Sequence, residues 1–364
     1  MPEIGQLGIA FLPGVMRPVV PRLIARMGLR LRIFHARHPP RKRDAGCLCA
    51  DHEHRVISMT TTPSVSTAPA VSTAPSVSTV TAACTAPSAS RLASATRWPS
   101  LFVSHGAPTY AMDPGLAGAQ LKELGHQLGR PRAIVVVSPH WMTRNVEVTG
   151  APRPSTVHDF GGFPRALFAL QYPAPGAPEL AAQIRQQLAS AGIAARLDTQ
   201  RGLDHGAWVP LLHLYPGADV PTVQVSLPID ADEHSALALG KALAPLAVNN
   251  VLIVGSGSLT HNLSDFRMDE GESAPLPYTQ EFSAWVRQAV TAKDLGRLIQ
   301  ALTLAPHAAR AHPTSEHFLP LFVALGAAHE AAKVTILDGG IRHRALAMES
   351  YLFGDYPVRL PNAV

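Results

Sequence analysis

The stretch RAIVVVSPHW, residues 132–141, is a run of β-branched residues that ends at a serine, with a histidine two positions later. Residues 134–137 are apolar without alternation, so both faces of this strand need cover from other parts of the chain. That pattern is typical of a central parallel strand between two layers of helices. It places His140 just past the carboxyl end of the strand.

Two further strands lead to histidines in the same way. Residues 101–105, LFVSH, end at His105, and in residues 251–261, VLIVGSGSLTH, a short glycine-serine loop precedes His261. The carboxyl ends of strands in an open α/β sheet line the crevice where ligands bind. We therefore expect these imidazoles to face one another although they are far apart in sequence.

The chain from residue 98 onward alternates strand and helix patterns, which predicts an α/β fold. Strands are expected at residues 100–104, 133–138, 145–149, 222–227, 251–255 and 334–337. Helices are expected at residues 116–128, 179–191, 232–243, 278–292 and 316–328. We predict a single domain over residues 96–364, with a mostly parallel central sheet flanked by helices and its site at the strand carboxyl ends.

The first 95 residues differ in composition from the rest. Residues 1–60 carry ten Lys and Arg against four Asp and Glu, so the basic charge of the chain resides there and predicts no nucleic-acid partner for the folded part. We expect a basic N-terminal extension, and whether the mature protein retains it stays open. Residues 61–95 contain the near-repeats VSTAPA, VSTAPS and VSTVTA, which predict a disordered low-complexity linker.

The cysteine content and the hydropathy indicate in which cellular compartment the protein is expected. Three cysteines among 364 residues argue against a disulfide scaffold and favour a reducing, cytoplasmic compartment. No uninterrupted apolar run reaches the roughly 18 residues that a membrane span needs, so we predict no membrane partner. The sequence leaves the oligomeric state open between monomer and dimer.

Seventeen histidines occur in the chain, and a lone loop histidine is usually exposed or structural. Those in small-residue or aromatic settings are His105 in SHGAP, His140 in SPHW, His158 in HDFGGFP, His205 in GLDHGAW, His261 in GSGSLTHNL, and His312 and His317 in HPTSEHFLPL. Residues 255–258, GSGS, fit neither the GxSxG elbow nor a dinucleotide fingerprint, and the sequence holds no P-loop motif and no HExxH.

In combination these motifs resemble those of the class III extradiol ring-cleaving dioxygenases, in the DOPA-dioxygenase-like branch. The resemblance runs from about residue 99 to the C-terminus and rests on LFVSHGAP, RAIVVVSPHW, HDFGGFPRALFALQYPAPG, GLDHGAWVPLLHLYP, GSGSLTHNL and HPTSEHFLPL. It implies an enzyme with a non-haem metal centre that opens the ring of a catechol-type, DOPA-like substrate with molecular oxygen.

The same resemblance implies roles for individual histidines. His105, His140 and His317 look like the ligands of one Fe(II) or Zn(II) ion per chain. His261 looks like either a fourth ligand or the catalytic base, and His205 like an acid-base or substrate-orienting residue.

The third motif departs from the wider class III group, which uses two histidines and a glutamate. Both Glu316 and His317 are present here, and we favour His317 because the histidine is the ligand in the branch that the sequence most resembles. Three imidazoles suit zinc as readily as iron.

The aromatic loop around His158 is expected to form a lid, so His158 joins His205 as a substrate-binding residue.

Two other functions stay open from the sequence. A zinc hydrolase would use the same histidines to activate water instead of oxygen. A non-catalytic metal-binding relative would take up metal without turnover, and the intact motif set makes it the weakest of the three hypotheses.

Overall fold

The computed structural model describes residues 97–268 and 274–361. The predicted extension (1–60) and linker (61–95) lie outside the described residues, so the domain boundaries stay predictions. The strands are β1 (Ser100–Ser104), β2 (Ala133–Thr143), β3 (Val146–Thr149), β4 (Ala195–Asp198), β5 (Thr222–Pro228), β6 (Val251–Gly257), β7 (Val334–Leu337), β8 (Ile341–Arg342), β9 (Leu346–Ala347) and β10 (Ser350–Phe353).

The helices alternate with these strands along most of the chain. The α-helices are α1 (Gly115–Leu128), α2 (Pro178–Ser190), α3 (His205–Leu214), α4 (Glu233–Leu243), α5 (Pro277–Thr291), α6 (Leu295–Ile299), α7 (Ala301–Leu304), α8 (Ala308–Ala311) and α9 (Leu319–Ala327). Short 3-10 helices are η1 (Pro108–Ala111), η2 (Arg165–Ala169) and η3 (Ala244–Asn249). Among the described residues, none of these helices has both the length and the apolar character needed to cross a bilayer.

Eight of the strands form one sheet in the order β4-β3-β5-β2-β6-β1-β10-β7. The centre is parallel, because β6 pairs in parallel with both β1 and β2, and β2 pairs in parallel with β5. Antiparallel pairing is confined to β3 with β5 and to β10 with β1 and β7. The mostly parallel α/β fold predicted from the sequence is therefore confirmed.

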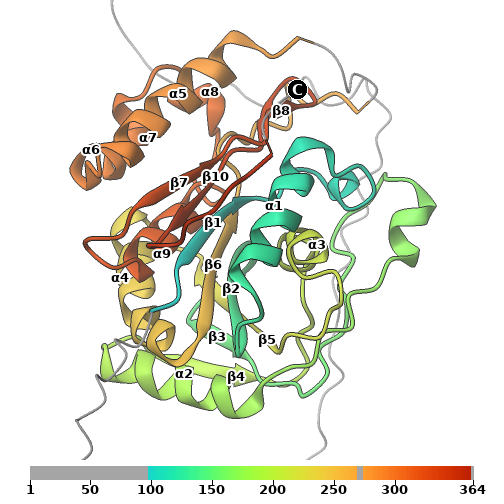
Figure 1. Ribbon diagram of the computed structural model, residues 1–364, viewed down its shortest axis with the longest axis vertical. Helices are drawn as coiled ribbons and strands as arrows, with labels where there is room; N and C mark the ends of the chain where they lie inside the picture. Colours follow the sequence, from blue (N-terminus) through green and yellow to red (C-terminus); the bar gives the residue numbers. More distant parts are fainter. Residues whose placement is uncertain (1–96, 269–273, 362–364) are drawn as a thin grey trace, which may run out of the picture. The chain divides into compact units, whose positions relative to one another are not determined.

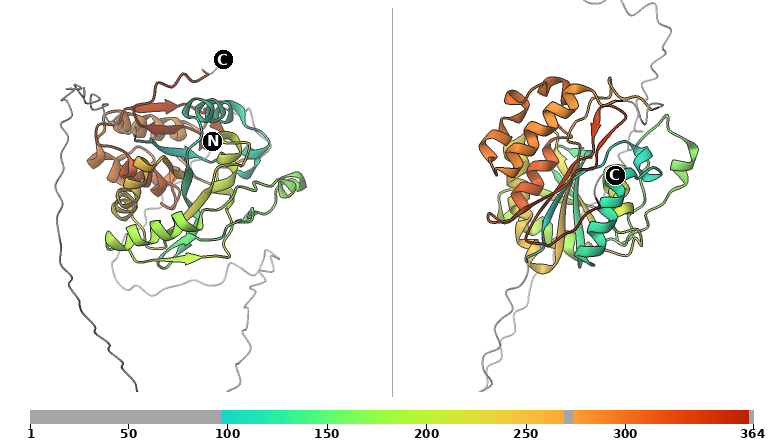
Figure 2. Two further views of the ribbon diagram at one scale, coloured as in Figure 1. Left: turned by 60° about the horizontal axis from the view of Figure 1, so that its bottom comes forward. Right: turned by 45° about the horizontal axis from the view of Figure 1, so that its top comes forward.

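Helices cover both faces of the sheet, as Figures 1 and 2 show. Residues Ile134 and Val136 of β2 pack into the core beneath α1 and α3, whereas Val135 and Val137 pack into the core beneath α2, α4, α5 and α9. All four side chains have no exposed surface. The apolar run without alternation therefore reflects a strand buried on both sides.

The position of His140 differs from the prediction, because β2 continues past it to Thr143. Pairing with β6 stops at Val137, and the register with β5 shifts between Val137 and Met142. Pro139 has no N–H to donate, so a regular ladder cannot pass through it. His140 thus lies on an irregular extension of the strand, beyond the end of its β6 neighbour.

Several regular elements were absent from the predictions, and two of them, α3 and β10, adjoin the predicted strands and histidines. Helix α3 begins at His205, where the Asp204 side chain accepts a hydrogen bond from the Ala207 N–H, and it contains Pro210. Strand β10 pairs between β1 and β7. A long loop was predicted over residues 152–178; the observed loop spans residues 150–177, and its part around residues 160–170, with η2, stands out beside α3 in Figures 1 and 2.

Candidate active site

Three histidines from distant parts of the chain meet at the carboxyl end of the parallel strands. His105 directly follows β1, His140 lies on the extension of β2, and His317 precedes α9. The Nε2 atom of His140 is 3.2 Å from Nε2 of His105 and 3.3 Å from Nε2 of His317. The three rings thus direct the same nitrogen toward one point.

Backbone contacts place these histidines. The N–H of His105 donates to the Gly257 carbonyl at 2.9 Å, which carries the β1 ladder one residue past the strand. The Ser258 N–H donates to the His317 carbonyl at 2.9 Å. A Cβ at Gly257 would lie 2.2 Å from that carbonyl oxygen, so the glycine allows the chain before α9 to approach the sheet.

Ser256 fixes the tautomer of His105. Its hydroxyl donates its one proton to the Gly206 carbonyl, so the 3.0 Å contact with Nδ1 of His105 must be an N–H donated by the ring. Nε2 of His105 then carries a lone pair. Both side chains are buried, so water does not compete for these contacts.

Two carboxylates act on the other rings in the same way. Oδ2 of Asp159 lies 3.4 Å from Nδ1 of His140, and Oε1 of Glu316 lies 3.2 Å from Nδ1 of His317. Because an ionised carboxylate can only accept, each ring carries its proton on Nδ1 and a lone pair on Nε2. Glu316 therefore faces the outer nitrogen of the third histidine.

This donor set fits a metal ion. The Nε2 atom of His140 is 3.2 Å from that of His105 and 3.3 Å from that of His317. The lone pairs on these nitrogens repel one another unless a cation binds them jointly. A metal-bound histidine usually donates its other N–H to a carboxylate, carbonyl or hydroxyl. Nδ1 of His105 and of His317 each form such a hydrogen bond, and Nδ1 of His140 lies 3.4 Å from the Asp159 carboxylate. Two overlapping groups, His140 with Asp159 and His205, and His261 with Glu316 and His317, also bring potential ligand atoms together. In those groups Nδ1 is the atom of His140, His205 and His317 that lies nearest the carboxylate.

Burial keeps the three rings neutral. It lowers the pKa of His105 and His317 well below the ordinary value, and the neighbouring imidazoles lower both further. Burial and then His205 lower the pKa of His140 to about 3, although Asp159 opposes this shift. Neutral imidazoles keep the lone pairs that a metal ion needs.

His205 lies directly against this cluster. It is the first residue of α3, and its ring centre is 3.9 Å from that of His140 and 5.6 Å from that of His105. Its Nδ1 lies 3.0 Å from Oδ2 of Asp159, out of line for a straight hydrogen bond. Burial raises the pKa of Asp159, but hydrogen bonds and charge from His205 outweigh it and bring the value to about 2.

His261 lies on the other side of the cluster. Its ring is stacked on His317 with centres 3.5 Å apart and planes 6° apart, and its backbone N–H donates to Ala311. Burial lowers its pKa to about 4, against the opposing charge of Glu316. The stacked ring is thus held neutral at the edge of the three-histidine centre.

His158 does not join the cluster. Its Nε2 donates to the Leu170 carbonyl at 3.0 Å, and its ring lies 5.7 Å from Phe160 and 5.9 Å from Phe168. Phe160 in turn packs edge-on against His205, with centres 5.6 Å apart. The loop of residues 150–177 therefore brings an aromatic group to the border of the site.

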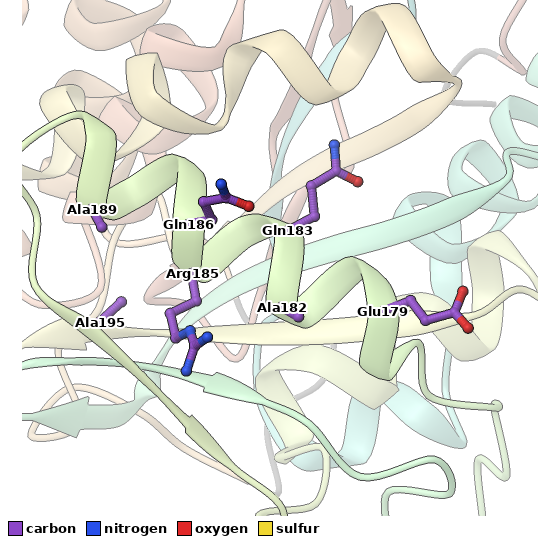
Figure 3. Close-up of a pocket in the computed structure, with 7 residues that line it drawn as sticks. All are labelled: Glu179, Ala182, Gln183, Arg185, Gln186, Ala189 and Ala195. Atoms are coloured by element: carbon purple, nitrogen blue, oxygen red, sulfur yellow. The ribbon is translucent and has the colours of Figure 1, made fainter. Parts of the chain in front are cut away.

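The sequence predictions missed two side chains that hold the centre. Asp159 stands next to the predicted His158 within HDFGGFP, and the motif alone does not show which rings it reaches. Ser256 contacts a histidine 151 positions away. A surface groove elsewhere, along α2, holds none of these residues (Figure 3); it is lined by Glu179, Ala182, Gln183, Arg185, Gln186, Ala189 and Ala195.

Comparison with known proteins identifies relatives of this chain. Residues 101–354 match the family model of the catalytic LigB subunit of aromatic ring-opening dioxygenase. The 4,5-DOPA dioxygenase extradiol of Escherichia coli (strain K12) is 39% identical over 263 residues, covering 71% of this chain and 95% of that protein. The 4,5-DOPA dioxygenase extradiol of Beta vulgaris is 40% identical over 250 residues, covering 66% and 92%.

A solved structure shares the fold. The crystal structure of an uncharacterised protein from Escherichia coli K12 superposes with a TM-score of 0.60 at 34% identity, covering 71% of this chain and all of that one.

Proposed function

This chain belongs to the family of LigB-type aromatic ring-opening dioxygenases and is an extradiol dioxygenase; from that premise we propose that it opens the ring of a DOPA-like catechol at a metal ion held by His105, His140 and His317. The substrate is proposed from the names of the two relatives, 4,5-DOPA dioxygenase extradiol. The zinc-hydrolase and non-catalytic alternatives have no support from these relatives.

The observation that carries the metal assignment is the shared orientation of three rings. Each Nε2 points to a common centre, and each Nδ1 meets an acceptor on a different residue. Neutral imidazoles suit both Fe(II) and Zn(II). We propose one ion per chain, with Fe(II) as the working metal because the reaction uses molecular oxygen.

The metal supplies a Lewis acid and a redox centre for the catechol and oxygen when it is bound. The chain itself supplies proton transfer. Nε2 of His205 is free to accept a catechol proton because Nδ1 of the same ring faces Asp159. His261, neutral at pH 7, is the second proposed acid-base group, and its position at the cluster edge also suits a fourth ligand.

The aromatic loop is proposed to contact the substrate. His158 and Phe160 lie within one group of rings that reaches His205. Aromatic side chains favour edge-on or offset contacts with another ring, which a catechol would provide. His158 and His205 are therefore proposed as substrate-binding residues. The cytoplasmic location and the monomer or dimer state stay predictions.

Anaerobic reconstitution with Fe(II) tests this function. The metal-free protein is loaded with Fe(II) or, as a control, Zn(II), and catechols including DOPA are screened with an oxygen electrode and by absorbance of yellow ring-opened products. We expect oxygen uptake with Fe(II) and none with Zn(II). Turnover of no catechol by fully Fe(II)-loaded protein would refute the proposal.

A further inference from the structure

We propose that Asp159 is a positioning residue that orients two histidines with different tasks at once, the metal ligand His140 and the substrate-side His205. This inference rests on the function proposed above and assigns a residue that the sequence motifs did not single out.

The contacts of Asp159 carry the inference. Oδ2 lies 3.4 Å from Nδ1 of His140 and 3.0 Å from Nδ1 of His205, so one charged oxygen lies close to both rings. Oδ1 accepts a hydrogen bond of 2.9 Å from the backbone N–H of His205, at the start of α3. The carboxylate therefore lies against the rings of both histidines and is hydrogen-bonded to the backbone of His205.

This arrangement differs from those of the other two ligands. Ser256 and Glu316 each hold the Nδ1 of a single ligand histidine. Asp159 also belongs to the aromatic loop, since the next residue, Phe160, packs on His205. A shift of Asp159 would thus disturb a ligand, an acid-base group and the loop that borders them.

The substitution Asp159→Asn separates these roles from simple packing. The amide keeps the size of the carboxylate but offers one acceptor oxygen, so it cannot accept from the backbone and from both rings. At least one ring then loses the partner that fixes its tautomer. Loss of such a partner of a metal-bound histidine typically weakens metal affinity about 10- to 100-fold.

The first measurement needs no turnover. The metal-free variants are titrated with Zn(II) against a chromophoric chelator, and circular dichroism checks that each is folded. We expect Asp159→Asn and Glu316→Gln both to weaken Zn(II) binding about 10- to 100-fold. Asp219→Asn, an exposed carboxylate paired with Arg130, should bind Zn(II) like the wild type. Wild-type affinity in Asp159→Asn would overturn the contact with His140.

The second measurement separates the histidines. At saturating Fe(II), kcat of Asp159→Asn should remain well below the wild-type value. The kcat of Glu316→Gln should return closer to the wild-type value, because only Asp159 also orients His205. Equal recovery in both variants would overturn the shared role. In a His205→Gln background, Asp159→Asn should still weaken Zn(II) binding but lower kcat little further, and a full additional loss of kcat would overturn the link.

A second variant covers the case in which Asp159→Asn does not fold. Asp159→Ser retains one small acceptor. It should bind Zn(II) more weakly than the wild type, and at saturating Fe(II) its kcat should stay below that of Glu316→Gln; these two results then decide the inference. If the Fe(II)-loaded wild type turned over no catechol, the proposed function would fail. The Zn(II) titration would still decide whether Asp159 holds His140.

Discussion

His312 and His317 are equally buried, each 5% exposed, yet only His317 faces other imidazoles. Nε2 of His312 donates to the Leu259 carbonyl at 2.9 Å, and its ring packs 5.4 Å from Phe282 and 5.1 Å from Phe318. In His317 both ring nitrogens meet side chains of the centre. Burial alone therefore does not distinguish the proposed ligand from a core residue, whereas the partners of the ring nitrogens do.

The largest effect is expected when each of the two histidines is replaced separately by glutamine. His317→Gln should lose the bound metal and at least about 10³-fold in kcat/KM, because a metal ion supplies several kcal/mol of transition-state stabilisation. His312→Gln retains a donor for the Leu259 carbonyl and should keep its metal. Metal content and oxygen uptake measure both. Equal metal loss in the two variants would contradict the comparison.

A smaller effect is expected where a ligand loses only its outer partner. Ser256→Ala removes the acceptor for Nδ1–H of His105 and should weaken metal binding about 10- to 100-fold, measured by chelator competition. Ser258→Ala is the matched control, because the Ser258 hydroxyl donates to the Thr260 carbonyl and touches no ligand side chain. Similar affinity in the two variants would argue against a fixed tautomer at His105.

Acid should destabilise the fold through His312. Burial lowers its pKa to about 4, so the unfolded chain binds a proton at pH 5 that the folded chain does not. Stability present above about pH 6.5 is lost as the pH falls toward 4, by about 2 kcal/mol between pH 7 and 5. Urea unfolding of metal-free wild type and His312→Gln should show a shallower loss in the variant. Parallel curves would mean that His312 is not held neutral.

The smallest effect is expected at His158, which also bonds a carbonyl but lies in the aromatic loop. His158→Ala removes one ring contact, generally worth about 0.5–1.5 kcal/mol, so KM should rise roughly two- to tenfold. Metal content should remain that of the wild type. Metal loss from the purified variant, with KM unchanged, would refute a role in substrate binding.

The meeting of His105 and His140 could be predicted because buried strands and the histidines that follow them both leave signals in the sequence. Strands buried on both faces have apolar runs without alternation, and parallel strands end at the same edge of the sheet. His317 lies outside this logic, and only the family resemblance indicated it. The predicted end of the strand at residue 138 was wrong, because β2 continues to Thr143. Pro139 indicates a break in the regular ladder, but the sequence does not show that the strand resumes after it.

The Ser256 and Asp159 side chains, which lie against Nδ1 atoms of proposed metal ligands, could not be predicted, because they come from other parts of the chain. The contact between His105 and Ser256 spans 151 positions, and hydroxyls of Ser256 and Ser258 look alike in GSGS although they have different partners. Helix α3 was missed because it begins with a histidine and a glycine and contains Pro210. Its start depends on Asp204 and Asp159, which form hydrogen bonds to its backbone N–H groups.

The order of strands in the sheet also governs how the chain can be made. Within residues 97–268 and 274–361, β1 pairs with β6 and β10 alone, and Ser100 lies opposite Ile253 and Phe353. At a synthesis rate of about 5–20 residues per second, the ribosome takes roughly 8–30 s to add the 150 or so residues between β1 and β6. During that interval the apolar LFV segment of β1 lacks both of the strands that it pairs with in the folded sheet. The proposed metal site would be complete later still, after residue 317 has left the exit tunnel.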